Sequence, residues 1–197
     1  TSVDDLRNYA NRFYPLLTGP SHTYDQQSDN RVPANYDRWL YNEYVLEDAT
    51  DWSWDNIRQL NFFMTRYQRA SGSESDINAQ VATIRFFRAL EYYSKIKSYG
   101  DVPWYEKDLN DTDTEELYKP RDSRDFVLGK IIEDLEFAIK WLPEKNAAVE
   151  CALHKDAART QLSRICLYYG TYKKYHNVQG TPTSQELLQK AADNALA

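Results

Sequence analysis

Residues 76–103 read DINAQVATIRFFRALEYYSKIKSYGDVP, and this stretch decides the fold. Its apolar side chains recur at spacings of three and four, which is the period of an amphipathic helix. The apolar stripe is too wide for one contact face, because Phe86, Ala89 and Tyr92 extend it sideways. Gly100 and Pro103 then end the periodic segment. We therefore predict a helix over residues 76–100 that packs against neighbours on two sides.

The same period predicts five further helices around this one. The apolar positions from Leu128 to Leu142 match the helical template most closely, and Pro143 closes that segment. No alternation of β-branched and polar residues competes with this pattern, so we predict an all-α fold. The expected helices cover residues 3–17, 53–71, 76–100, 122–142, 154–170 and 184–197.

The wide apolar faces also predict how the helices are arranged. We expect antiparallel helix pairs stacked in a tetratricopeptide-like array rather than a closed four-helix bundle. The chain has 197 residues, of which 42% are apolar and 27% are charged, as in an ordinary folded protein. We therefore expect a single helical domain over residues 1–197. No segment approaches the roughly 18 uncharged apolar residues that a membrane span requires.

Composition excludes several classes of function. The chain has 24 basic and 30 acidic residues, a net charge of −6, and no basic cluster that could follow a nucleic-acid backbone. Its six glycines are scattered, so they form no nucleotide-binding loop. The acids from Asp111 to Asp122 lack the glycine and the final glutamate of a calcium loop, and the histidines lack zinc-site spacing. We expect no cofactor and no metal. Cys166 lies in an apolar helical segment, so we expect a buried free thiol.

Residues 18–52 form a long, aromatic-rich excursion between two predicted helices. Turn-forming residues alternate there with Tyr and Trp, and the whole chain has 16 Tyr and 5 Trp against 7 Phe. Loops of this length in compact domains are usually functional or disordered, and the aromatic content argues against disorder.

Within this excursion, aromatic faces stand beside groups that could bind sugar hydroxyls. The candidate ligand-binding residues are Asn35, Tyr36, Asp37, Trp39 and Tyr41. The alternative is that Trp39 and Tyr41 only cover the helix ends beneath them. No residue is predicted to be catalytic.

Several ordered blocks resemble the SusD/RagB family of outer-membrane nutrient-binding lipoproteins. The blocks are Trp54, Ile57, Arg58 and Asn61; Arg85 to Leu90 with Tyr92, Tyr93 and Tyr99 to Pro103; Pro120, Arg121, Ile131 to Leu135, Ala138, Leu142 and Pro143; and Ala157, Ala158, Arg164, Leu167, Tyr168 and Gly170 to His176. The last block is most similar to the RagB-like branch. These positions also have a structural interpretation. Arg85 and Arg88, one turn apart, can pair with carbonyls or acids between helices.

The resemblance implies a non-catalytic subunit with a lipid anchor at the extracellular face of the outer membrane. Such a subunit would cover a SusC-like TonB-dependent transporter and pass it an oligosaccharide or, in RagB-like members, peptides, as in a starch utilisation system. Family members are more than twice as long and begin at a lipidated cysteine. The resemblance therefore implies that this chain is an N-terminal portion whose anchor lies upstream. The family's ligand contacts lie in variable loops, so none is transferred by residue.

Two other classes of function stay open at the level of sequence. A helical glycosidase would need two carboxylates about 5 to 9.5 Å apart, and with 30 acids the composition alone does not argue for such a pair. A helical-repeat adaptor would bind protein segments in its groove. The resemblance favours oligosaccharide binding over both.

Overall fold

The computed structural model describes residues 1–17, 32–38, 40–43, 45, 52–148 and 150–197. Within these ranges the regular elements are helices, joined by two isolated bridges, Ser2 with Ser71 and Val102 with Asp122. The α-helices are α1 (Val3–Asn11), α2 (Asp55–Met64), α3 (Glu74–Tyr99), α4 (Thr114–Leu117), α5 (Arg124–Trp141), α6 (Lys155–His176) and α7 (Ser184–Leu196), and 3-10 turns cover Tyr14–Leu16 and Tyr67–Arg69. The predicted all-α class is confirmed.

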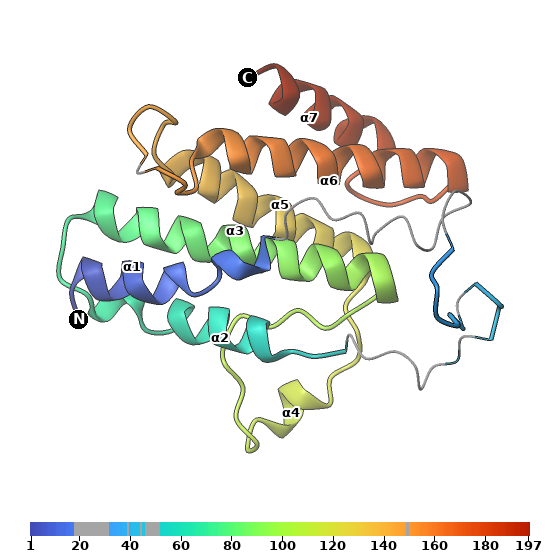
Figure 1. The fold of residues 1–197 in the computed structure, drawn as a ribbon, viewed down its shortest axis with the longest axis horizontal. Coiled ribbons are helices and arrows are strands. Elements are labelled where there is room, and N and C mark those ends of the chain that lie inside the picture. Colours follow the sequence, from blue (N-terminus) through green and yellow to red (C-terminus); the bar gives the residue numbers. More distant parts are fainter. Residues whose placement is uncertain (18–31, 39, 44, 46–51, 149) are drawn as a thin grey trace.

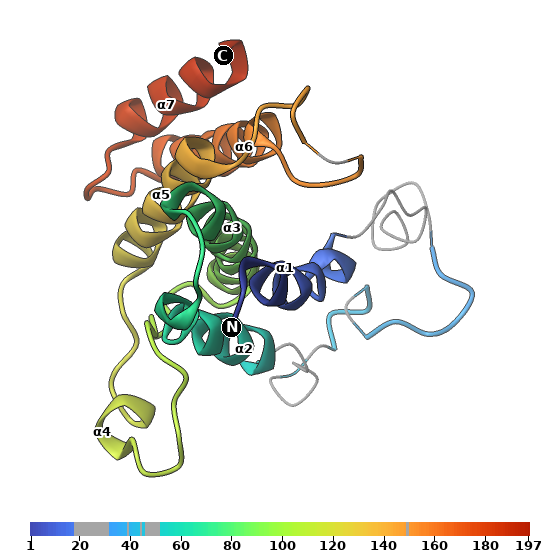
Figure 2. The same cartoon turned by 90° about the vertical axis from the view of Figure 1, so that its left-hand side faces the viewer.

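The six longer helices alternate in direction along the chain and stack on one another (Figure 1). Helix α3 lies at the centre, with α1 and α2 on one side and α5 on the other. Helix α6 packs between α5 and α7 (Figure 2). This arrangement agrees with the expected tetratricopeptide-like stacking. No helix in the described part of the chain is long and apolar enough to span a membrane.

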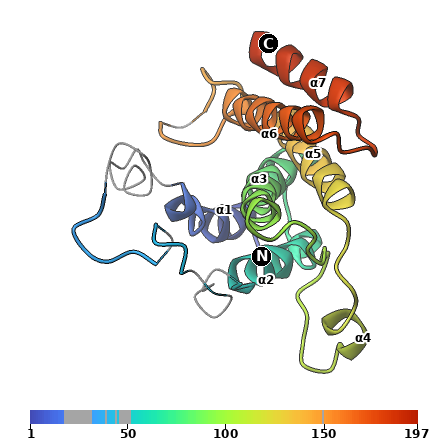
Figure 3. The ribbon, with the colours of Figure 1, turned by 90° about the vertical axis from the view of Figure 1, so that its right-hand side faces the viewer.

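Two segments project from the stack. Residues 32–38 and 40–43 stand away from α1 and α2, and the connection that carries α4 extends on a different side (Figure 3). Residues 111–116 are acidic or polar and show no apolar period, so the sequence does not predict α4. It is a single turn with no buried residue, and such a turn leaves no periodic signal.

Hydroxyl side chains cap four of the helices. Ser2, Ser73, Ser123 and Thr183 each accept a hydrogen bond from a backbone N–H in the first turn of α1, α3, α5 and α7. Because Ser73 is the cap, α3 begins at Glu74, two residues before the predicted start. Gly100 ends α3 at a φ of 74°, as the sequence predicted.

The first two helices are shorter than predicted. Helix α1 ends at Asn11 and α2 at Met64, and each is followed by a 3-10 turn that covers part of the remaining predicted length. In the first case Pro15 has no N–H to donate, and the chain closes i to i+3 hydrogen bonds instead, such as Leu16 N–H to the Phe13 carbonyl at 2.9 Å.

Helix α6 is longer than the predicted 154–170, because it continues through Gly170 to His176. Helix α7 crosses so close to Gly170 that a Cβ there would lie 2.8 Å from Leu188 Cγ. The glycine therefore serves helix packing and does not end the helix. Asn177, at a φ of 53°, ends it instead.

The core confirms that α3 packs on more than one side. Four consecutive residues, Phe86, Phe87, Arg88 and Ala89, are all buried. Successive helical residues point about 100° apart, so four buried in a row leave no solvent-facing side at this turn. Phe87 contacts the rings of Phe13 and Tyr14 beyond the C-terminal end of α1, and Phe86 is buried and meets the Phe87 ring edge to face at 5.5 Å.

The two cysteines are expected to differ sharply in reactivity. Cys166 is fully buried, and burial raises the pKa of its thiol to about 12, whereas Cys151 is exposed. We expect a thiol reagent such as Ellman's reagent to label one cysteine per native chain at pH 8 and both in 6 M guanidinium chloride. A Cys151→Ser variant should then show no rapid labelling when native. Rapid labelling of Cys166 in that variant would contradict the burial.

Candidate binding site

A buried ion cluster holds the centre of the molecule together. Asp134 of α5 accepts hydrogen bonds from Arg88 Nε at 2.7 Å and Nη2 at 2.8 Å, and from Arg85 Nε at 2.6 Å. Asp134 is 1% exposed and Arg88 6%. Burial alone would lower the pKa of Arg88, but Asp134 outweighs it and raises the pKa. The prediction that Arg85 and Arg88 pair with acids between helices is confirmed.

The cluster continues through Asn61 to the segment that follows α3. Arg88 Nη1 donates to Asn61 Oδ1 at 3.2 Å, and Asn61 Nδ2 donates to the Tyr105 carbonyl at 2.7 Å. The Tyr105 N–H donates to the Tyr92 hydroxyl at 2.8 Å. Both backbone polar groups of Tyr105 are therefore held by buried side chains of α2 and α3, which fixes the segment in one position.

This fixed segment forms one wall of a groove of about 400 Å³, a volume typical of small-ligand sites. Trp52 and Trp54 precede α2 and meet edge to face at 5.2 Å, and Trp54 meets Tyr105 in the same way at 5.4 Å. Ile57 and Asn61 of α2 line the groove and are fully buried. The groove thus combines aromatic side chains with a buried amide.

Basic side chains surround these aromatic rings. Arg58, Lys107, Lys119 and Arg121 line the groove. The Arg121 guanidinium lies 4.9 Å from the centre of the Trp52 ring, and Lys119 Nζ lies 4.9 Å from the centre of the Tyr105 ring. Burial, followed by the charges of Glu116 and Asp122, raises the pKa of Tyr105, so its hydroxyl is protonated at neutral pH.

Four of the predicted site residues, Asn35, Tyr36, Asp37 and Tyr41, lie elsewhere, in the projecting residues 32–38 and 40–43. The rings of Tyr36 and Tyr41 stack with their centres 4.8 Å apart and are 61% and 60% exposed. The Tyr36 hydroxyl donates to Glu43, and this hydrogen bond raises the pKa of Tyr36. Asn35 is exposed and Asp37 is half-buried.

The structure therefore brings Tyr36 and Tyr41 together, and both residues are well exposed. Trp39 lies outside the described residues. The ligand role of all five predicted residues stays a prediction.

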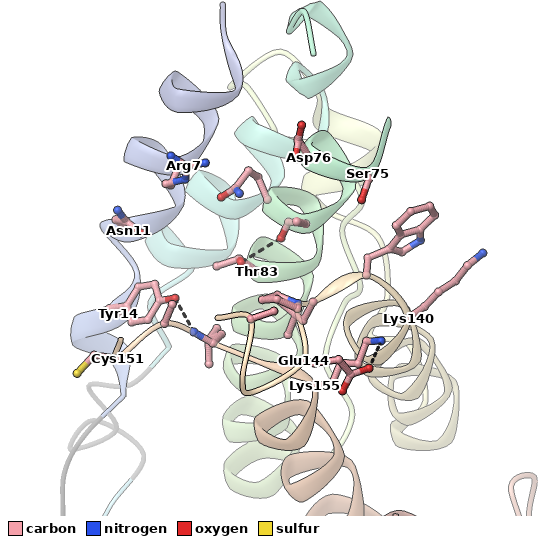
Figure 4. A pocket seen from close by; sticks show the side chains of 18 of the residues that line it. Arg7, Asn11, Tyr14, Ser75, Asp76, Thr83, Lys140, Glu144, Cys151 and Lys155 are labelled. Atoms are coloured by element: carbon pink, nitrogen blue, oxygen red, sulfur yellow. Dashed lines mark hydrogen bonds and ion pairs between the residues drawn. The ribbon is translucent and has the colours of Figure 1, made fainter. Parts of the chain in front are cut away.

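A larger cleft, of about 1030 Å³, opens between α1, α3 and the connection from α5 to α6 (Figure 4). Its charged lining is of mixed sign, and Lys155 pairs with Glu144 at 2.7 Å. The Tyr14 hydroxyl is occupied by the Leu153 N–H at 2.9 Å. Among the described residues, Tyr14 and Trp141 are the aromatic ones that line this cleft, whereas Trp52, Trp54 and Tyr105 line the smaller groove beside α2. The groove beside α2 therefore offers more aromatic side chains to a sugar in a smaller volume.

Sequence reasoning singled out several groove residues without assigning them to a site. Four groove residues belong to the sequence blocks that resemble the family, and those blocks also have a structural interpretation. They are Trp54, Arg58, Asn61 and Arg121. Trp52 was counted as part of the aromatic excursion, and Tyr105 was not singled out. The repeated tryptophan in Trp52-Ser-Trp54 was the one local signal for an aromatic wall.

The described residues thus form a stack of helices that carries exposed aromatic side chains and an aromatic groove. Residues 6–167 match the family model of SusD-like proteins described as "Starch-binding associating with outer membrane". The match covers most of the chain, and the chain belongs to this family.

Individual relatives agree with this assignment. The chain is 28% identical to SusD-like protein P2 of Formosa agariphila over 101 residues, which are 51% of this chain and 20% of that protein. A SusD-like protein from Bacteroides fragilis superposes with a TM-score of 0.75 at 23% identity, covering 96% of this chain and 37% of its own. A laminarin-binding SusD-like protein gives a TM-score of 0.56 at 22% identity, covering 74% of this chain and 28% of its own.

Proposed function

We propose that this chain belongs to a non-catalytic binding subunit that captures an oligosaccharide at the extracellular face of the outer membrane and delivers it to a SusC-like TonB-dependent transporter. The observation that carries the proposal is the family match over residues 6–167. Because the chain spans 37% of the Bacteroides fragilis structure, we further propose that it is the N-terminal helical portion of a longer, lipid-anchored protein.

The surface chemistry supports the choice of an oligosaccharide. Pyranose rings have apolar faces that pack on flat aromatic side chains, while their hydroxyls need hydrogen-bond partners nearby. Tyr36 and Tyr41 present such faces with Asn35 and Asp37 adjacent in sequence, and Trp52 and Trp54 stand beside Arg58 in the groove.

The proposal includes the absence of hydrolysis. Among the described residues no group of three His, Cys, Asp or Glu side chains could hold a metal ion. Incubation of the purified chain with laminarin oligosaccharides should leave their length distribution unchanged in chromatography. Shorter products that disappear when one acidic residue is replaced would overturn the non-catalytic assignment.

The tyrosine pair gives a direct test of binding. If Tyr36 and Tyr41 stack on sugar, Tyr41→Ala should weaken oligosaccharide binding by about 1–3 kcal/mol, taking the magnitude of a nucleobase stacked on an aromatic side chain as the guide. Isothermal titration calorimetry against a panel of neutral and acidic oligosaccharides measures the loss. Tyr175→Ala is the matched control, since Tyr175 is 74% exposed and lies at the far end of α6.

The two variants should keep the helical far-UV signal of the parent chain. Equal weakening by Tyr41→Ala and Tyr175→Ala would remove the tyrosine pair from the site. Binding of peptides in place of every oligosaccharide in the panel would overturn the proposed function.

A further inference from the structure

The groove beside α2 concentrates positive charge in a chain that is negative overall. Among the residues that the structure describes, four that line the groove are basic and none is acidic, while the whole chain carries a net charge of −6. A cleft lined by charges of one sign focuses the local potential and attracts ligands of the opposite sign. The difference between the basic groove and the acidic chain as a whole is the first indication that the ligand is negatively charged.

Two of the four cations are already paired. Lys107 lies 3.1 Å from Asp113, and Lys119 lies 3.4 Å from Glu116 and 3.5 Å from Asp122. These acids stand outside the groove lining. They hold the two lysines in place and cancel much of their charge.

The two arginines keep their charge available. Arg58 donates through Nε to the Leu109 carbonyl at 3.1 Å, and Arg121 donates through Nη1 to the Asp101 carbonyl at a long 3.4 Å. Within the described ranges neither guanidinium has a carboxylate at ion-pair distance. Both residues are exposed, so their remaining N–H donors are open to a ligand. A guanidinium matches the two oxygens of a carboxylate or sulfate better than any other side chain does.

Aromatic surface and free arginines meet in the same groove. Arg121 lies against the Trp52 ring, and Arg58 begins on the same helix turn that carries Ile57 of the lining. A ligand that suits this combination has an apolar ring face and an anionic group on the ring. A neutral sugar could stack on the aromatic rings, but both guanidinium groups would then stay solvated by water and contribute no ion pair.

We propose that the groove formed by Trp52, Trp54, Tyr105, Arg58 and Arg121 binds the acidic residues of an oligosaccharide, through the carboxylate of a uronic acid or through a sulfate ester. This inference rests on the proposed oligosaccharide-binding function and specifies its substrate class. Asn61 and Tyr92 hold the Tyr105 wall in position before the ligand arrives, so little ordering of that wall is needed on binding.

The test compares matched acidic and neutral probes by calorimetry on the purified chain. Tetragalacturonic acid and its methyl ester differ in charge and share one ring skeleton. A sulfated carrageenan tetrasaccharide and its desulfated form separate the sulfate source from the carboxylate source. We expect at least one acidic probe to bind about tenfold or more tighter than its neutral partner, equivalent to about 1.4 kcal/mol. Raising NaCl from 50 to 500 mM should reduce that preference.

The double variant Arg58→Gln with Arg121→Gln should bind the acidic probe and its neutral partner with about equal affinity. The double variant Lys145→Gln with Lys174→Gln changes the net charge equally at exposed positions outside the groove, and it should keep the preference. Far-UV circular dichroism checks that both variants fold, and the salt series on the parent chain is an independent readout.

The outcomes separate the inference from the proposed function. Equal binding of acidic and neutral partners, or loss of the preference in both double variants, overturns the acidic-sugar site and leaves oligosaccharide binding standing. If the chain binds only neutral oligosaccharides, the acidic-sugar site is likewise overturned and oligosaccharide binding stands. No binding of any oligosaccharide overturns both.

Discussion

Replacing Asp134 by alanine should lower the free energy of unfolding by about 3–5 kcal/mol, since it leaves Arg88 charged and buried without a partner. Arg88 is 6% exposed and directs two of its N–H groups at Asp134, and Arg85 directs a third. Typical domains unfold at a cost of about 5–15 kcal/mol, so this loss is a large part of the total. Urea denaturation followed by far-UV circular dichroism measures it.

The neighbouring residue supplies the control. Glu133 is a half-exposed carboxylate on the same helix, paired with Lys130 at 3.1 Å. Its replacement by alanine should cost no more than about 0.5 kcal/mol, because surface ion pairs between residues one helical turn apart contribute little. Equal losses in the two variants would mean that burial of the cluster does not determine its contribution.

The Asp134→Ala variant has a second consequence at the groove. Arg88 also holds Asn61, and Asn61 holds the carbonyl of Tyr105. Loss of Asp134 should therefore also weaken the hydrogen bonds through which Arg88 and Asn61 hold the Tyr105 wall of the groove. We expect Asp134→Ala to weaken oligosaccharide binding even at temperatures where the chain stays folded.

Replacing Phe87 by alanine should destabilise the chain by about 3–5 kcal/mol, the usual range for a large aromatic residue removed from a core. Phe87 is 0% exposed and packs on Phe13 at 6.2 Å and edge to face on Tyr14 at 5.4 Å between ring centres. The cavity would open between α3 and the segment that follows α1. Thermal and urea unfolding both report the loss.

The matched control is Phe126→Ala at the start of α5. Phe126 is 47% exposed, so the same atoms are removed from a position where about half of the residue's surface already faces water. We expect a change below about 1 kcal/mol, as for surface substitutions in general. A small effect of Phe87→Ala would show that the junction of α1 and α3 repacks freely.

The sequence by itself determined where the helices lie and what class of fold they form. Helical periodicity depends on contacts three and four residues apart, so the stripe of residues 76–100 and the stop at Gly100 were visible locally. The Arg85 and Arg88 pair, one turn apart, also predicted carbonyl or acidic partners between helices. The identity of that partner, Asp134, came from the packing of α3 on α5.

Tertiary structure alone decided the groove and the length of α6. Tyr105 is placed by Asn61 and Tyr92, residues 44 and 13 positions away, and no local pattern encodes such contacts. The expected helix stopped at Gly170, but the helix continues to His176 and α7 packs so closely that a Cβ at position 170 would lie 2.8 Å from Leu188 Cγ. In both cases long-range contacts outweigh local preference, because the free energy of packing exceeds the small propensity differences that a sequence displays.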